Sequence, residues 1–242
     1  MKAIVVVPTF NEAANLPAFV PAMLTRGVSG LGMLIVDDES PDGTGRLADD
    51  IAARWPGRVE VLHRHGRRGL GSAYIAGFRR ALEAGADVVV QMDADFSHAP
   101  GDVPRLVAAL ADYDVAIGSR YVAGGAASEN WSPGRRALSR WANIFSRIIL
   151  RLKTRDATAG FKAWRRTALE AVDLGRIRSE GYVFQVEMAY LCERLGLRIS
   201  EVPITFEERH DGRSKMTLGI KLDSAAGVFR IRRRHRGIRP LS

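Results

Sequence analysis

Short apolar runs rich in β-branched residues alternate with helical patterns through the first half of the 242-residue chain. Five such runs lie at residues 3–7, 33–36, 59–62, 88–92 and 115–117, and four helical stretches separate them. Strands that are buried on both faces read as continuous apolar runs rather than as alternating ones. The sequence therefore predicts an α/β fold with a mostly parallel central sheet that carries helices on both faces.

The composition narrows the possible partners and the compartment. The formal net charge of +9 predicts a polyanionic partner, which could be nucleic acid, an anionic membrane or a phosphorylated substrate. Nucleic-acid motifs and a pattern of stacking aromatic residues are missing from the sequence, which disfavours specific nucleic-acid binding. Cys192 is the single cysteine, so no internal disulfide can form and a reducing cytoplasm fits.

Polar residues follow three of the expected strands. The segments PTFNE, DDESPDGT and DADFSH begin at Pro8, Asp37 and Asp93. Because ligands of parallel sheets bind beyond the carboxyl ends of the strands, these segments should meet at one rim. Asp93 and Asp95 could approach a hard divalent cation there. Alternatively, the two carboxylates could cap the helix that starts near Pro100.

The segments after the first two strands leave alternatives open. The Asp37 and Asp38 pair supplies acceptors that suit a nucleobase or ribose, while residues 40–43 form a turn into the next helix. An ordinary connection between strand and helix would look the same. Likewise, Thr9 and Glu12 could form only a capping box.

Seven motifs in order resemble polyprenol-phosphate mannosyltransferases (dolichol-phosphate mannose synthases) of glycosyltransferase family 2: PTFNE, DDESPDGT, DADFSHAP, GSRY, DATAGFKAW, GYVFQVEM and RHDGRSKMT. The resemblance spans roughly residues 3–220. It implies a GT-A, Rossmann-like catalytic domain over residues 1–216 and a basic C-terminal helix or tail over residues 217–242. It also implies GDP-mannose as donor, a polyprenyl phosphate lipid as acceptor, and Mg²⁺ or Mn²⁺ as cofactor.

The resemblance also assigns the donor and metal residues. The donor nucleotide pocket would be lined by Pro8, Phe10, Glu12, Asp38, Asp42 and Asp93. Asp93 and Asp95 would hold the metal, with Asp95 counted as catalytic. Ser97 stands where the family often has a further Gln ligand, and a hydroxyl is a shorter and poorer ligand, so metal preference could differ.

Arginines supply the expected phosphate sites. Arg120, the second residue counted as catalytic, would bind the acceptor phosphate with Arg135 or Arg136, because an arginine fork matches a phosphate in two-pronged fashion. Whichever of Arg135 and Arg136 is not used would be a solvated helix start. A lipid phosphate is already ionised near neutral pH, so a single inverting displacement needs no general base, and His98 is expected to be a loop hydrogen bonder.

Two further groups depend on the resemblance. Arg209, Arg213 and Lys215 would close over the donor pyrophosphate or the acceptor, although an exposed basic loop would look similar. Gln185 and Glu187 would lie on the inward face of a helix near the sugar, or else form a surface stripe of that helix.

Membrane contact is expected to be peripheral, on the cytoplasmic face. No uncharged apolar run reaches the ~18–20 residues of a spanning helix, so no transmembrane helix is expected. Residues 135–152 are typical of an interfacial helix, although a core-facing amphipathic helix would look similar. The arginine-rich run 230–236 favours an anionic membrane surface, and a membrane-protein partner is possible.

Two other functions remain open. A polyprenyl-phosphate glucosyltransferase of the same family that uses UDP-glucose would share these motifs, which constrain the nucleotide loosely and the sugar hardly at all. A catalytically silent scaffold would share the fold, but the intact Asp93, Asp95 and Arg120 argue against it.

Overall fold

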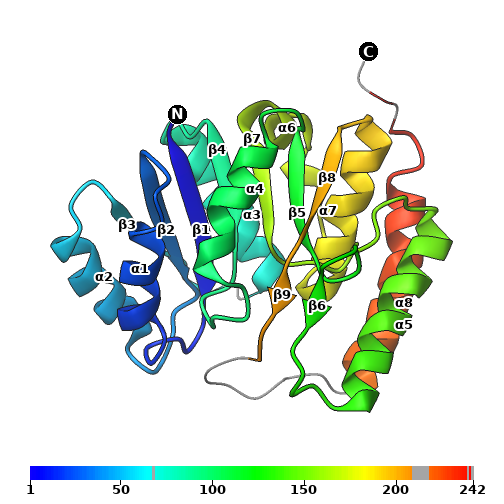
Figure 1. Ribbon diagram of the computed structural model, residues 1–242, viewed down its shortest axis with the longest axis horizontal. Helices are drawn as coiled ribbons and strands as arrows, with labels where there is room; N and C mark the ends of the chain where they lie inside the picture. The colour runs from blue at the N-terminus through cyan, green and yellow to red at the C-terminus, as the bar shows by residue number, and fades with distance from the viewer. Residues whose placement is uncertain (67–68, 209–217, 239, 241–242) are drawn as a thin grey trace.

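The computed structural model describes residues 1–66, 69–208, 218–238 and 240. Its centre is a seven-stranded sheet in the order β3-β2-β1-β4-β7-β5-β8 (Figure 1). The strands are β1 (Ala3–Thr9), β2 (Leu31–Asp37), β3 (Val59–His63), β4 (Val88–Gln91), β5 (Val115–Ser119), β7 (Lys162–Arg165) and β8 (Ile199–Pro203). Every neighbouring pair is parallel except those made by β7, which runs antiparallel to β4 and β5. The mostly parallel sheet and all five expected strands are confirmed.

Helices cover both faces of the sheet. On one face lie α1 (Leu16–Leu24), α2 (Thr44–Arg54) and α4 (Val103–Ala109), the last preceded by η1 (Pro100–Asp102). On the other face lie α3 (Leu70–Glu83), α6 (Arg166–Ala171), η2 (Leu174–Arg176) and α7 (Gly181–Leu195). Alternate residues of β1 enter the two layers: Val5 and Val7 pack with α1, whereas Ile4 and Val6 pack with α3. Burial on both faces explains the continuous apolar runs.

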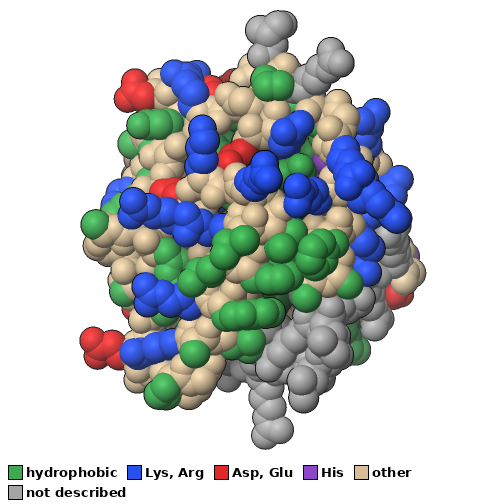
Figure 2. Space-filling model, turned by 90° about the vertical axis from the view of Figure 1, so that its right-hand side faces the viewer, with side chains coloured by type: hydrophobic (Ala, Val, Ile, Leu, Met, Phe, Trp, Pro, Cys, Tyr) green, Lys and Arg blue, Asp and Glu red, His purple; other side chains and the backbone are tan. Residues whose placement is uncertain are grey.

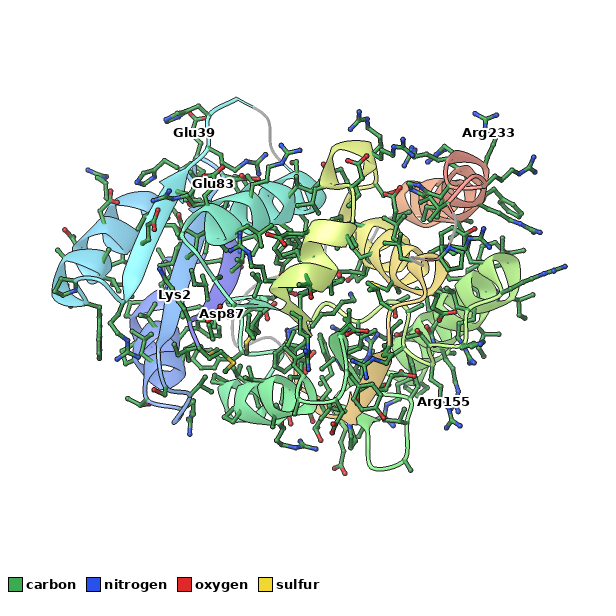
Figure 3. The ribbon with its side chains drawn as sticks, turned by 90° about the horizontal axis from the view of Figure 1, so that it is seen from above. Lys2, Glu39, Glu83, Asp87, Arg155 and Arg233 are labelled. Carbon is green, nitrogen blue, oxygen red and sulfur yellow. The ribbon has the colours of Figure 1, made fainter. Side chains whose placement is uncertain are left out.

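Close approach of α3 to the sheet needs a glycine. A Cβ atom on Gly77 would lie 2.3 Å from Cγ1 of Val6 and 3.0 Å from Cγ2 of Val36. Lys2 and Asp87 lie at the edge of the sheet where the parallel strands begin (Figure 3). The Lys2 backbone N–H donates a hydrogen bond to Asp87 Oδ2 at 2.6 Å there. The polar segments predicted to meet therefore share the other edge.

A helical pair stands beside the sheet. The long helices α5 (Pro133–Leu150) and α8 (Leu218–Arg234) run side by side (Figure 1), and α8 also packs against α7. Val228 and Ile231 of α8 join a third apolar cluster with Leu150 and Val186. A two-stranded parallel sheet of β6 (Ala126–Ala127) and β9 (Thr205–Phe206) lies near the start of α5. Among the described residues, no helix combines the length and apolar character that crossing a bilayer requires.

A buried ionic cluster fastens α8 to α7. The side chain of Glu187 is fully buried and accepts hydrogen bonds from Arg234 Nη1 at 2.7 Å and from the Ser179 backbone N–H at 3.1 Å. Its Oε1 also lies 2.7 Å from Nε2 of the buried His235. Burial alone would raise the pKa of Glu187, but the hydrogen bonds from His235, Ser179 and Arg234 outweigh it and lower the pKa to about 2.

Glu187→Gln is expected to lower the free energy of unfolding by about 3 kcal/mol at pH 7, because it removes a carboxylate whose pKa lies well below its unfolded value. This stabilisation is fully present above the unfolded pKa and is lost as the pH falls toward the folded one. Urea titrations of both proteins should therefore give a difference at pH 3 that is less than half of that at pH 7. An equal difference at the two pH values would contradict the assignment to the ionised carboxylate.

Candidate functional site

The ends of β1 and β2 are joined by side-chain hydrogen bonds at the carboxyl rim of the sheet. Thr9 and Asp37 are register partners, and Thr9 Oγ1 donates to Asp37 Oδ1 at 3.2 Å. Ser40 Oγ donates to the same oxygen at 2.6 Å and accepts from the Asn11 backbone N–H at 3.1 Å. Glu12 lies in the same turn and accepts from Asn15 Nδ2 at 2.7 Å. Since Thr9 binds Asp37, the alternative of a capping box between Thr9 and Glu12 is wrong.

Asp42 builds the turn into α2. Its Oδ1 accepts from the Thr44 backbone N–H at 3.0 Å and from Thr44 Oγ1 at 2.6 Å, while its Oδ2 accepts from the Ala13 backbone N–H at 3.2 Å. Burial would raise the pKa of Asp42, but the hydrogen bonds from Thr44 and Ala13 lower it below the usual value. Asp42 and Ser40 thus both stabilise the connection between β2 and α2.

Asp38 is held by the two ends of the connection between β3 and α3. Its Oδ1 lies 2.5 Å from Arg64 Nη1, and its Oδ2 accepts from the Gly69 backbone N–H at 3.0 Å. Pro8 and Phe10 are half-buried at the end of β1, on the neighbouring strand. Phe10, Glu12, Asp38 and Asp42 therefore lie in the connections after adjacent strands, as the sequence predicts, whereas Pro8 is the second-last residue of β1.

The acidic pair after β4 does not cap a helix. Asp93 Oδ1 accepts from the Tyr74 hydroxyl at 2.8 Å, and Asp95 Oδ1 accepts from the Ser97 backbone N–H at 3.0 Å. The N-cap residues of η1 and α4 are Ala99 and Asp102, and neither makes a side-chain cap hydrogen bond. The helix-capping alternative for Asp93 and Asp95 is therefore wrong.

Backbone strain gathers around the same rim. Asn11, Glu39 and Phe96 have φ angles of 63°, 55° and 59°, in the left-handed region that disfavours side chains. They lie in the turns after β1, β2 and β4 respectively. Non-glycine residues in this conformation cluster at functional sites, where the surrounding structure holds them in place. This placement supports the rim as the functional edge of the sheet.

Three polar side chains lie close to the Gly160 backbone. A Cβ atom placed on Gly160 would lie 3.5 Å from His98 Cε1, 3.6 Å from Asp93 Oδ2 and 3.8 Å from Gln185 Nε2. His98 is buried between Phe161 and Phe206, and burial lowers the pKa of His98 to about 4, which keeps the ring neutral at pH 7. The His98 side chain beside Gly160 is therefore uncharged at pH 7.

The donor atoms near Asp93 suit a hard cation. Ser97 Oγ is buried and has no hydrogen-bond partner within the described residues, and it follows Asp95 by two positions. The described residues contain no group of three or more His, Cys, Asp and Glu side chains that could hold a metal. A cation at this rim would therefore rely on the carboxylates of Asp93 and Asp95, a hydroxyl oxygen and oxygens of ligand and water. Mg²⁺ is usually bound in this manner.

Arg120 is buried at the end of β5 and is already paired. Its Nε and Nη2 each donate to the Asp156 carboxylate at 2.8 Å, and Nη2 also donates to Thr158 Oγ1 at 2.7 Å. Burial would lower the pKa of Arg120, but the Asp156 charge holds it above the usual value. Nη1 makes no hydrogen bond within the described part of the chain, so that atom can still donate to a ligand.

Arg135 and Arg136 organise the start of α5. The Arg135 guanidinium lies 4.1 Å from the centre of the Trp131 ring and 3.3 Å from Glu208 Oε1. Arg136 Nη2 donates to the carbonyl oxygens of Ser128 at 3.1 Å and of Glu129 at 2.6 Å. Both arginines lie in the first turn of α5, where Arg136 is exposed, so the alternative of a solvated helix start stays open for either of them. Arg209, Arg213 and Lys215 lie outside the described residues.

Gln185 and Glu187 are both buried on α7, so the alternative of a surface stripe is wrong. The structure also corrects the expectation that they share one face. Side chains that are two residues apart on a helix point in nearly opposite directions. Gln185 accordingly faces Gly160 and Asp93, whereas Glu187 faces Arg234 and His235 of α8.

Four residues near the rim were not singled out from the sequence. Tyr74 binds Asp93, Asp156 binds Arg120, and Lys162 and Gln91 bind Gln185. Lys162 and Gln91 did carry a signal, because each is a polar residue at the end of a buried strand, next to apolar residues. A buried polar side chain needs a partner, so such interruptions indicate a specific internal contact.

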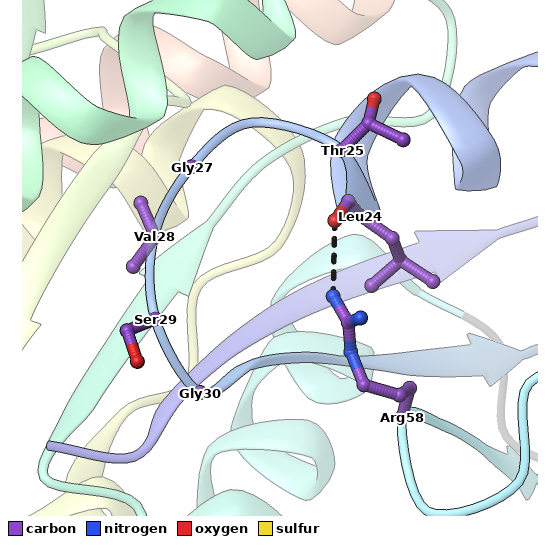
Figure 4. A pocket seen from close by; sticks show the side chains of 7 residues that line it. All are labelled: Leu24, Thr25, Gly27, Val28, Ser29, Gly30 and Arg58. Atoms are coloured by element: carbon purple, nitrogen blue, oxygen red, sulfur yellow. Dashed lines mark hydrogen bonds between the residues drawn. The ribbon is translucent and has the colours of Figure 1, made fainter.

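A separate hollow of about 390 Å³ lies between α1 and β2 (Figure 4), at the amino-terminal edge of the sheet. Its lining includes Leu24, Val28 and Arg58. Arg58 is its one charged side chain, and it donates to the carbonyl oxygens of Leu24 and Leu31 at 3.0 and 2.9 Å. With its charge used internally and the polar rim on the far edge, this hollow is not the candidate site.

Comparison with protein-family models matches residues 4–173 to "Glycosyl transferase family 2". The match takes in β1 through α6 and includes the rim residues from Pro8 to Arg120. The chain belongs to glycosyl transferase family 2. It is therefore a glycosyltransferase, and the sequence-based recognition of the family is confirmed.

Relatives extend the likeness over most of this glycosyltransferase. It is 48% identical over 230 residues to an undecaprenyl-phosphate mannosyltransferase of Micrococcus luteus, covering 95% of this chain and 93% of that protein. It is 47% identical to a polyprenol monophosphomannose synthase of Mycolicibacterium smegmatis, covering 89% and 81%. A dolichol-phosphate mannosyltransferase of Pyrococcus furiosus is 38% identical, with 89% of this chain and 59% of that protein covered.

Solved structures confirm the expected GT-A-like fold of the glycosyltransferase. A crystal structure of glucosyl-3-phosphoglycerate synthase from Mycobacterium tuberculosis matches with a TM-score of 0.67 and 22% identity, covering 100% of this chain and 81% of that chain. At this identity the likeness concerns the fold alone.

Proposed function

We propose that this glycosyltransferase transfers mannose from GDP-mannose to a polyprenyl monophosphate, with Mg²⁺ or Mn²⁺ as cofactor. The observation that carries the proposal is the 48% identity over nearly the whole chain to a protein named undecaprenyl-phosphate mannosyltransferase. A second relative at 47% identity is named for the same product class. The rim of acidic residues and arginines supplies groups that suit a nucleotide sugar and a phosphate acceptor.

The donor would lie across the ends of β1, β2 and β4. Asp38 and Asp42 offer carboxylate oxygens to ribose or base, and both are held rigidly by backbone N–H groups. Asp93 and Asp95 would hold the metal ion, which neutralises the departing diphosphate as a Lewis acid. These residues have their positions set by hydrogen bonds before ligand arrives, which favours catalysis by preorganisation.

The acceptor needs positioning rather than a base. Its phosphate is ionised near neutral pH, so an oxygen can attack the anomeric carbon directly and invert it. Arg120 Nη1 would bind this phosphate, while Asp156 keeps the rest of the guanidinium in place. His98 plays no acid–base role in this scheme, in agreement with its neutral, apolar setting.

A nucleotide-release assay tests the donor assignment. Purified enzyme with Mn²⁺ and a polyprenyl phosphate should release GDP from GDP-mannose and should release little UDP from UDP-glucose. Omitting the lipid should return GDP release to the background rate. Release of UDP from UDP-glucose in place of GDP would overturn the mannose donor and favour the glucosyltransferase alternative.

We further propose that α5 rests on an anionic membrane surface on the cytoplasmic side. The helix is turned with Asn143 and Ser146 buried, while Trp141, Ile144 and Ile148 remain 53%, 44% and 68% exposed. A core-facing amphipathic helix would instead bury its large apolar side chains and expose its polar ones. Figure 2 shows the hydrophobic side chains gathered on this face with basic side chains around them. Such an arrangement is typical of an interfacial helix.

Ile148→Glu is expected to weaken binding to vesicles that contain phosphatidylglycerol by at least tenfold. The change removes a large apolar side chain, worth about 1.5–3 kcal/mol when buried, and adds a repelled charge. Vesicle flotation measures the bound fraction. Tyr113→Glu, at a residue 40% exposed between α4 and β5, is the control and should leave binding unchanged. Equal losses in the two variants would contradict the assignment of α5.

A further inference from the structure

Three polar side chains form an island inside the apolar layer between the sheet and α7. Gln91 of β4 and Lys162 of β7 are register partners on adjacent antiparallel strands, and Gln185 reaches them from α7. Their exposed fractions are 0%, 0% and 3%. Burial lowers the pKa of Lys162 to about 7, because an ammonium group is costly to remove from water. Because burying an amine costs free energy of desolvation, a buried Lys162 indicates a specific structural or functional contact.

The hydrogen bonds of the island fix the orientation of one amide. Lys162 Nζ donates to Gln185 Oε1 at 2.8 Å, and Gln91 Nε2 donates to the same oxygen at 2.5 Å. Lys162 Nζ also donates to the Ala159 carbonyl oxygen. In its charged form Lys162 can only donate, so the amide oxygen of Gln185, and not its nitrogen, faces Nζ. A flipped amide would set donors against donors.

With its oxygen bound to Lys162 and Gln91, the Gln185 amide has its nitrogen close to Gly160. Gln185 Nε2 makes no hydrogen bond within the described residues and lies 3.8 Å from a Cβ position on Gly160. Asp93 Oδ2 lies 3.6 Å from the same position. Gln185 Nε2 therefore lies beside the same backbone position as Asp93, the acidic residue expected near the donor diphosphate.

We propose that Lys162 is a positioning residue that, together with Gln91, holds the Gln185 amide so that its N–H donors bind a hydroxyl of the transferred sugar. This inference rests on the proposed function, because its ligand is the sugar of a sugar nucleotide. A hydroxyl acceptor recognised by a fixed donor gives selectivity, since the wrong epimer leaves that donor unpaired. Gln185 would contact the substrate, and Lys162 would act through Gln185.

Titration calorimetry with GDP-mannose and with GDP, each with Mn²⁺, separates sugar recognition from nucleotide binding. Gln185→Glu keeps the side-chain shape and the bond to Lys162 but replaces both N–H donors by an oxygen. We expect its Kd for GDP-mannose to rise at least tenfold while its Kd for GDP changes less than twofold. Asn130→Asp, an amide-to-carboxylate change at an exposed position, is the matched control and should alter neither value.

Lys162→Met tests the positioning role. With the ammonium group removed, the Gln185 amide can flip, so we expect a three- to tenfold rise in Kd for GDP-mannose and a smaller preference for GDP-mannose over GDP-glucose. Thermal melting records any general loss of stability, which would weaken GDP binding as well.

The outcomes distinguish the inference from the proposed function. If wild-type enzyme binds neither GDP nor GDP-mannose, the proposed function fails and this inference falls with it. If wild-type binds both, but Gln185→Glu weakens both equally or neither, the sugar contact is overturned while the proposed function stands. If only Lys162→Met leaves the affinity and the sugar preference unchanged, the positioning role of Lys162 is overturned.

Discussion

Asp95→Ala is expected to lower the rate of sugar transfer by about 100- to 1000-fold while the protein stays folded. In the proposed mechanism the change removes one of two carboxylates that hold the metal ion, and loss of a single preorganised charge-stabilising group costs about 10²–10³ in rate. Asp95 also accepts a hydrogen bond from the Ser97 backbone N–H, so thermal melting of the variant records any structural loss. Such a bond contributes about 1 kcal/mol.

Initial rates with saturating donor and lipid measure this effect. Asp102→Ala is the matched control, since Asp102 lies seven positions later on η1 and makes only a surface ion pair with Arg105. Its rate should stay within twofold of wild type. A rate for Asp95→Ala within tenfold of wild type would show that this carboxylate is not part of the reaction centre.

Asp156→Asn should lower the free energy of unfolding by about 3 kcal/mol or more. The guanidinium of Arg120 is only 9% exposed, and Asp156 is fully buried, so the variant leaves a buried cation without its counterion. Breaking one side of a buried ion pair typically costs 3–5 kcal/mol. The same variant should reduce transfer, because Arg120 would lose the contact that holds Nη1 toward the acceptor.

Urea denaturation at pH 7 measures the stability term. Glu208→Gln breaks the half-exposed pair with Arg135 and serves as the control, with an expected loss below about 1 kcal/mol. Similar losses of unfolding free energy in the two variants would mean that burial does not determine how much the Arg120 and Asp156 pair stabilises the fold.

The sheet could be read from the sequence because its strands are buried on both faces and stand out as continuous apolar runs. The strand β7 could not, since its four residues begin with Lys162 and end with Arg165, and its place between β4 and β5 depends on pairing across distant segments. Local patterns carry no record of which strands pair. The edge strand β8 is half-buried throughout and gives an equally weak signal.

The site was predictable where it follows a strand and unpredictable where it depends on a distant partner. Asp38, Asp93 and Asp95 come directly after strands, so topology brings them to one rim. The partners of Arg120 and Glu187 are 36 and 48 residues away in the chain. No spacing rule connects such pairs. The motif around Glu187 therefore predicts a position beside the sugar, whereas the structure shows Glu187 bound to Arg234 and His235 at the end of α8.

The central claim is most directly tested by transfer of radiolabel from GDP-mannose into an organic-extractable lipid, using purified enzyme, a polyprenyl phosphate and Mg²⁺ or Mn²⁺. We predict label in the lipid phase that disappears with EDTA and with Asp95→Ala. No label from GDP-mannose under these conditions, together with label from UDP-glucose, would contradict the mannose assignment and leave only the fold and the family.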